Sequence, residues 1–248
     1  MTTDVDQVAE MRPELDEALL GLDQLAQENP DEALAMFDTL PEPVKTLPDF
    51  QLVLARTRQG LGELDEARRI AQAVVDQEEE HADAHHLLGD LLEDLKDEDG
   101  ANRHFLRTLA LDKIAYETHS EIPSEKLLEA LTKILKATCE ELPEEYRSPF
   151  QAQLFPSEDD VKNGVDPRAL SIWSHGNNEK GRLVLYGANL DAEYGDLNEF
   201  NEFGPHVSDT IRAEITHHLQ LSDEVVAKLG WQESEPPPRR ASSPPEFS

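Results

Sequence analysis

The chain has 248 residues, of which 22 are Lys or Arg and 53 are Asp or Glu, so its formal net charge is −31. A surface this acidic repels phosphate groups, which argues against binding to nucleic acid or to an anionic membrane surface. The single cysteine, Cys139, excludes an intramolecular disulfide and a four-cysteine zinc site. The first residues are acidic and no apolar run approaches membrane-spanning length, so the sequence predicts a cytoplasmic protein without a secretory signal.

The N-terminal half repeats a pattern of small and large residues every 34 positions. The repeating columns are Ala33, Ala67 and Ala101; Phe37, Ala71 and Phe105; and the pairs Leu20–Gly21, Leu54–Ala55 and Leu88–Gly89. Small residues allow two helices to approach closely, and a large residue one turn after the alanine fills the space between neighbouring helices. The spacing predicts an all-α array of three helix–turn–helix units, at 14–47, 48–81 and 82–115.

This pattern resembles the tetratricopeptide repeat, whose unit is also a 34-residue pair of helices. The resemblance implies a stacked array with a groove for a protein or peptide partner. A helical spacer or a dimerisation element would require the same pattern, so these interpretations stay open beside the binding groove.

Three histidines, His81, His85 and His86, cluster in the third unit. His81 and His85 are four residues apart, a spacing that can bind a metal ion on one helix face. No third ligand stands nearby in the sequence, and we therefore expect all three to be solvated surface side chains.

The second half, from about residue 118, loses the 34-residue register and mixes helices with strands. We expect a helix over 124–139 capped by Ser124, an extended segment over 151–155, a turn-rich connector over 157–170 and a strand over 182–186. A polar insertion over 189–205 and a helix over 208–219 follow. Together with the helical first half, this predicts an α+β protein.

The expected helix over 208–219 has two different faces. Val207, Ile211, Ile215 and Leu219 recur every four residues and form a stripe that we expect to be buried. At 100° per residue, His217 points away from this stripe, which is typical both of an active-site helix and of any amphipathic surface helix.

The order of these elements resembles the small zincin-like metallopeptidases that are widespread in bacteria. The segments that carry the resemblance are LPEEYRSPF, SEDDV followed by GVDP, RLVLY, and IRAEITHHLQLSDEVVAKLGW, within a domain over 118–231. The family motif is H-E-x-x-H-H-x-G-x-x-D, in which histidines and the aspartate bind zinc and the glutamate is the general base. The alignment places Ala213 on the first histidine, Glu214 on the base, His217 on the second histidine and Asp223 on the acidic ligand.

Ala213 has no donor atom, so only His217 and Asp223 remain as matched ligands, which is too few for a tight catalytic zinc. The glycine of the motif is replaced by Gln220, for which a left-handed conformation costs about 1 kcal/mol. If the chain did not turn there, Asp223 would not face His217.

The sequence thus predicts a protein-interaction or scaffolding protein with a non-catalytic metallopeptidase-like domain and no cofactor. The alternative is a zinc-dependent peptidase with an altered ligand set, in which Glu214 is the base, His217 and Asp223 are ligands, and His206 swings in from a preceding loop. Cys139 is expected to be a buried thiol, and residues 232–248, rich in proline and serine, are expected to form a disordered tail.

Overall fold

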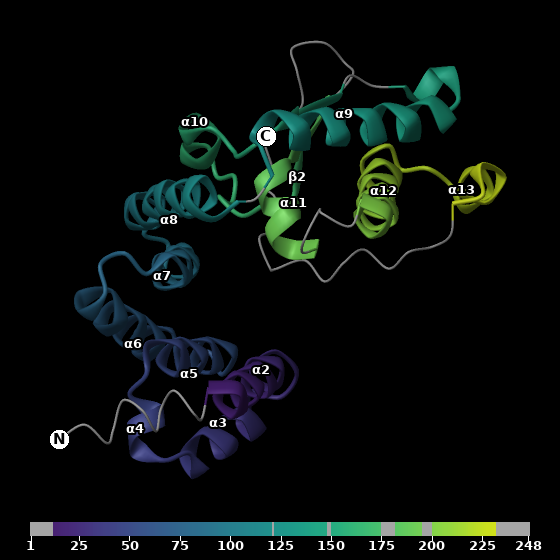
Figure 1. The fold of residues 1–248 in the computed structure, drawn as a ribbon. Helices are drawn as coiled ribbons and strands as arrows, with labels where there is room; N and C mark the ends of the chain where they lie inside the picture. Colours follow the sequence, from purple (N-terminus) through teal and green to yellow (C-terminus); the bar gives the residue numbers. More distant parts are fainter. Residues whose placement is uncertain (1–11, 121, 148–149, 175–181, 195–199, 232–248) are drawn as a thin grey trace. The chain divides into compact units, whose positions relative to one another are not determined.

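The computed structural model describes residues 12–120, 122–147, 150–174, 182–194 and 200–231, and the class of the protein is α+β, as predicted (Figure 1). The chain divides into two compact units, residues 1–111 and 112–248. The division falls inside one helix, shortly before the predicted end of the third repeat. The predicted tail over 232–248 lies outside the described residues.

Unit 1 consists of helices that follow one another in pairs (Figure 1). The helices are α2 (Arg12–Glu28), α3 (Pro30–Thr39), the short α4 (Glu42–Lys45), α5 (Pro48–Gly60), α6 (Leu64–Gln77), α7 (Ala82–Asp94) and α8 (Glu98–His119). The second helices of the three pairs, α3, α6 and α8, begin at residues 30, 64 and 98, which are 34 residues apart. The first helices α5 and α7 begin at residues 48 and 82, with the same spacing.

The repeating columns of the sequence are the contacts within and between these pairs. Ala33, Ala67 and Ala101 are all buried. In the third pair, Gly89 of α7 lies against the ring of Phe105 on α8, so closely that a Cβ at position 89 would overlap the ring. The equivalent Gly21 of α2 faces open space. The close approach of helices therefore depends on the glycine in the third pair and not in the first.

Unit 2 contains a three-stranded sheet with strand order β1-β3-β2. The strands are β1 (Phe150–Gln153), β2 (Ser171–Ser174) and β3 (Arg182–Tyr186). The central strand β3 runs parallel to β1 and antiparallel to β2. Both predicted bounds of β3 are confirmed, whereas β1 begins one residue and ends two residues earlier than predicted. The strand β2 was not predicted, because four residues that include two serines give little periodicity.

The helices of unit 2 are α9 (Ser124–Glu141), α10 (Glu158–Lys162), α11 (Gly187–Tyr194), α12 (Phe200–His218) and α13 (Asp223–Leu229), with a 3₁₀ turn over Glu144–Tyr146. The predicted helix over 124–139 is confirmed, but the predicted cap is wrong: the N-cap position is Pro123, without a side-chain cap. The expected connector over 157–170 contains α10, which a capping box between Ser157 and Asp160 begins.

The expected polar insertion over 189–205 is wrong at both ends. Its first residues belong to α11, and α12 begins at Phe200, eight residues before the predicted start. Leu190 is completely buried, and the buried amide of Asn189 donates hydrogen bonds to the carbonyls of Pro167 and Ala169, at 2.9 and 2.7 Å. The polar side chain that suggested a surface loop thus ties α11 to the chain before β2.

The core of unit 2 joins helices α9 and α12 to the central strand. Its buried members include Leu127, Leu131 and Leu135 of α9, Leu183 and Leu185 of β3, and Val207, Ile211 and Ile215 of α12. The alternating leucines of β3 share one face of the sheet, and the α12 residues recur at helical spacing. Among the described residues, no helix has the length and apolar content that crossing a membrane requires.

Candidate functional site

Helix α12 carries the residues of the sequence motif on the side away from its buried stripe. Ile211 and Ile215 are 0% and 2% exposed, as predicted. His217 is exposed, whereas Ala213 and Glu214 are half-buried. The helix therefore separates a core face from a face that solvent reaches, and Ala213 supplies only a methyl group to the latter.

The turn after α12 takes the shape that a glycine would favour, although no glycine is present. Gln220 has a left-handed backbone with φ of 48°. Its N–H donates to the carbonyl of His217 at 3.2 Å, and the N–H of Leu221 donates to that of Thr216 at 3.1 Å. This is the Schellman pattern of hydrogen bonds, and buried Leu221 follows it. The left-handed turn therefore forms with a glutamine at this position.

Asp223 is the first residue of α13 and is exposed. Ser222 occupies the N-cap position, and its side chain makes no capping hydrogen bond. Asp223 and Glu224 both stand in the first turn, where a carboxylate interacts favourably with the helix dipole. Asp223 thus has a structural role that requires no metal.

The described side chains do not supply the ligands that a catalytic zinc needs. Across residues 12–231, where the structure describes them, no three His, Cys, Asp or Glu side chains lie together as a metal site would require. The side chains of His206 and His218 lie outside the described residues. The backbone of His206 belongs to α12, so the expectation of a preceding loop is wrong.

Beside the motif, three residues that sequence reasoning missed form a polar and aromatic cluster. The carboxylate of Glu141 on α9 accepts a hydrogen bond from Nε1 of Trp231 at 2.7 Å and from Nη2 of Arg212 at 3.2 Å. The Arg212 guanidinium lies 5.9 Å from the centre of the Trp231 ring. Because these residues are far apart in the sequence, no local pattern could have revealed the cluster. It attaches the chain after α13 to α9 and α12.

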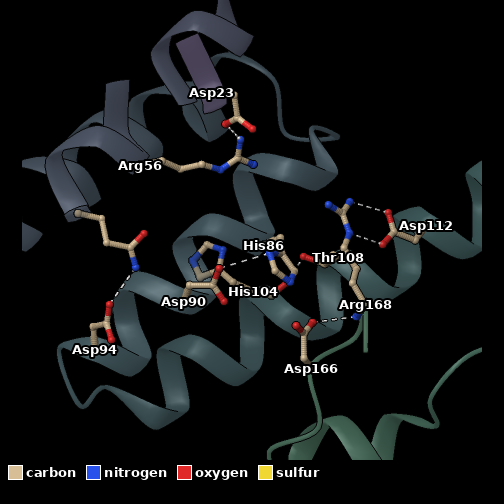
Figure 2. A network of polar contacts seen from close by, with 11 residues as sticks. Asp23, Arg56, His86, Asp90, Asp94, His104, Thr108, Asp112, Asp166 and Arg168 are labelled. Carbon is tan, nitrogen blue, oxygen red and sulfur yellow. Dashed lines mark hydrogen bonds and ion pairs between the residues drawn. The ribbon is translucent and has the colours of Figure 1, made fainter. Parts of the chain in front are cut away.

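A second candidate surface lies on unit 1, where polar side chains link neighbouring first helices (Figure 2). Arg56 of α5 donates to Asp23 of α2 at 2.9 Å. In the other direction, the amide of Gln59 on α5 donates to Asp94 of α7, also at 2.9 Å. These contacts join α2, α5 and α7 into one polar row, in which Asp23, Arg56 and Gln59 are half-buried and Asp94 is exposed.

The histidines of the third pair correct the sequence prediction. His85 and His86 are each only 7% exposed, so the expectation of solvated side chains is wrong for both. His86 packs against Phe105 and lies 3.4 Å from Asp90. Nδ1 of His85 lies 2.9 Å from Nδ1 of His104 on α8. The helical face that holds these rings points to α8, which the 34-residue columns alone did not indicate.

Burial changes the acid–base properties of this region and of Cys139. Desolvation is the main cause that lowers the pKa of His85 and of His104 below the ordinary value of 6.5. Desolvation also raises the pKa of the Cys139 thiol to about 11. Cys139 is a buried thiol, as predicted, and its environment does not favour a nucleophilic thiolate.

Comparisons with family models, with curated proteins and with solved structures found no match for this chain.

Proposed function

We propose that the chain is a protein-interaction or scaffolding protein. In this proposal, unit 1 is a short tetratricopeptide-like array that binds a peptide or protein partner, and the region over 118–231 is a non-catalytic relative of the small zincin-like metallopeptidases. The observation that carries the proposal is the row of polar side chains along α2, α5 and α7. A stacked helical array offers such a row as an extended binding surface.

The chemistry of the row favours a basic partner. Its carboxylates Asp23 and Asp94 outnumber its one guanidinium, that of Arg56, and the whole chain has a net charge of −31. An acidic surface raises the association rate of a basic segment and repels an acidic one. We therefore propose a partner segment rich in Lys or Arg, bound in an extended or helical form.

A pair of matched arginine variants tests where the partner binds. Arg56 belongs to the row, whereas Arg69 pairs with Glu66 on the exposed side of α6, a second helix. The full chain is screened against a library of basic peptides and against control peptides in which acidic residues replace the basic ones. The proposal expects that basic peptides bind and that their affinity falls as the salt concentration rises. It also expects that this affinity changes at least several-fold in Arg56→Gln but not in Arg69→Gln. Equal effects of the two variants, or no binding of any basic peptide, would contradict it.

The non-catalytic assignment of the second region rests on Ala213. The methyl group stands where the motif needs an imidazole, and the neighbouring described residues give no three-donor group. Zinc analysis of protein purified without a histidine tag tests this directly. Near-stoichiometric zinc, together with peptide cleavage that Glu214→Gln abolishes, would overturn the assignment.

One observation keeps the zinc peptidase as a second candidate. Gln220 still makes the left-handed turn that the motif assigns to glycine, so the corner between α12 and α13 persists. If the pocket is otherwise preserved, Ala213→His is expected to raise the zinc affinity of the full chain well above that of the parent. A control variant, Ala213→Gln, adds bulk at the same position without an imidazole. No gain in Ala213→His would indicate that the remaining donors His217 and Asp223 do not converge on one ion.

A further inference from the structure

Two histidines contact each other between the helices of the third pair, and their hydrogen bonds fix the position of each proton. Nε2 of His85 lies 3.1 Å from the carbonyl oxygen of Glu79. A carbonyl only accepts, so Nε2 carries a hydrogen. A neutral imidazole has one N–H, so Nδ1 of His85 is left as an acceptor.

The partner ring must then be the donor. Nδ1 of His104 lies 2.9 Å from Nδ1 of His85, which is hydrogen-bond distance. Because His85 accepts there, Nδ1 of His104 carries the hydrogen, and the neutral pair has one consistent arrangement: Nε2–H on His85 and Nδ1–H on His104. The two rings come from α7 and α8, so this bond joins the helices of the pair.

Protons added to this arrangement have unequal effects. A first proton on Nε2 of His104 leaves the shared hydrogen bond in place. A second proton has only Nδ1 of His85 as its site, where it would face the N–H of His104 and bring two positive charges into contact. The bond between α7 and α8 cannot survive that state.

The surroundings offer little compensation for charge on the pair. Arg107 on α8 and His81 at the start of α7 are the charged or titratable groups that act on His85. Arg103 and Asp97 act on His104, and Asp97 is the only anion among the four. From α5, Asp49 lies 3.4 Å from His81 and so partly offsets that ring.

We propose that the His85–His104 contact is a proton-sensitive joint in unit 1. Its hydrogen bond persists while at most one ring is charged and breaks when both rings are charged. Both rings have a pKa below the unfolded value of 6.5, so the unfolded chain takes up more protons as the pH falls. The stabilisation is therefore fully present above pH 6.5 and is lost as the pH falls from there through the folded pKa values. Acid loosens α7 from α8, and neutral pH restores the contact.

The arrangement of protons can be measured without any variant. Long-range ¹H–¹⁵N correlation spectra of the histidine-labelled full chain at pH 7.5 are expected to show His85 protonated at Nε2 and His104 at Nδ1. On titration, both rings are expected to take up protons only below pH 6.5. The same tautomer in both rings, or a pKa of 6.5 or more for either, would overturn the proposal. So would a shift of both Nδ1 resonances on adding equimolar zinc, which would identify a metal site instead.

Stability measurements test the consequence. In His104→Asn, the amide nitrogen occupies the place of Nδ1 and can donate to His85, but it cannot become charged. Between pH 7.5 and 5.5, the melting temperature of the parent is expected to fall by more than that of His104→Asn. His119 is an exposed position on the same helix, and the melting temperature of His119→Asn is expected to fall by as much as that of the parent. An equal loss in the parent and His104→Asn would contradict the joint.

Discussion

Gly89 of α7 lies under the ring of Phe105 on α8, with no room for even a methyl group between them. These two residues belong to different columns of the 34-residue pattern, so the pattern records a contact between two helices. The first pair has a glycine and a phenylalanine in the same columns, Gly21 and Phe37, yet Gly21 faces open space. The same sequence signal thus has two structural outcomes.

This difference predicts opposite effects for the same substitution at two positions. Gly89→Ala is expected to destabilise the protein by about 1–3 kcal/mol, because the added methyl group forces the Phe105 ring or α7 to move. Gly21→Ala is expected to stabilise it by up to about 1 kcal/mol, because alanine favours the helix and meets no neighbour. Urea denaturation followed by circular dichroism measures both. Destabilisation of similar size in the two variants would contradict the contact.

The two left-handed turns that flank α13 give a reciprocal prediction. Gln220 has φ of 48° and Gly230 has φ of 68°. Gln220→Gly is expected to stabilise unit 2 by up to about 1 kcal/mol, because glycine adopts this conformation without the steric cost of a Cβ. Gly230→Gln is expected to lower its stability by a similar amount. Thermal unfolding of the two variants beside the parent checks the signs, and a loss of stability in Gln220→Gly would be evidence against the turn.

Trp231 is predicted to contribute strongly to the stability of unit 2. It is 5% exposed and donates to Glu141. Trp231→Ala is expected to cost about 3–5 kcal/mol through the cavity it leaves. Trp231→Phe keeps most of the buried ring but loses the hydrogen bond to a carboxylate, which is worth about 1.5–3 kcal/mol. Denaturant unfolding of both variants measures the losses. No loss in Trp231→Phe would argue against the hydrogen bond, and nearly equal losses in the two variants would argue against the contribution of the buried ring.

Cys139 is predicted to be unreactive in the folded protein. Its pKa is raised to about 11 by burial, so almost no thiolate exists at pH 8. A chromogenic thiol reagent is expected to react only after denaturant is added. Because the folded pKa lies above the unfolded value of 9.0, the stabilisation by this thiol is present below pH 9 and is lost as the pH rises toward 11. Cys139→Ser provides the blank, and rapid labelling of native protein would contradict the burial.

The parts of the fold that the sequence predicted are those with a periodic local signal. The 34-residue columns predicted the helix pairs, and Leu183 and Leu185 stand in a run whose β-branched and aromatic neighbours, Val184 and Tyr186, indicated β3. The strand β2 and helix α11 were missed because short polar segments have no period, and their stability comes from pairing with β3 and from Asn189. The cluster around Glu141 was missed because its members are separated by 71 and 90 residues.

The candidate site was predicted only as far as a motif can specify positions. The alignment indicated which residues share α12, and the buried stripe at Ile211 and Ile215 is confirmed. It did not indicate that Gln220 would accept the strained turn, since tertiary packing of Leu221 decides that conformation. The burial of His85 was missed because a histidine in a first helix carries no sign of which neighbour will cover it.

The spans of these contacts also bear on how the polypeptide emerges from a ribosome. The side-chain bonds that link neighbouring first helices of unit 1, Arg56–Asp23 and Gln59–Asp94, join residues 33 and 35 positions apart. In unit 2, the bond from Trp231 to Glu141 spans 90 positions. Short loops close at low entropic cost, so each early hairpin of helices can dock while translation continues. Closure of the later half has to await synthesis of Trp231, and until then its apolar strand and helices are exposed to chaperones and to aggregation.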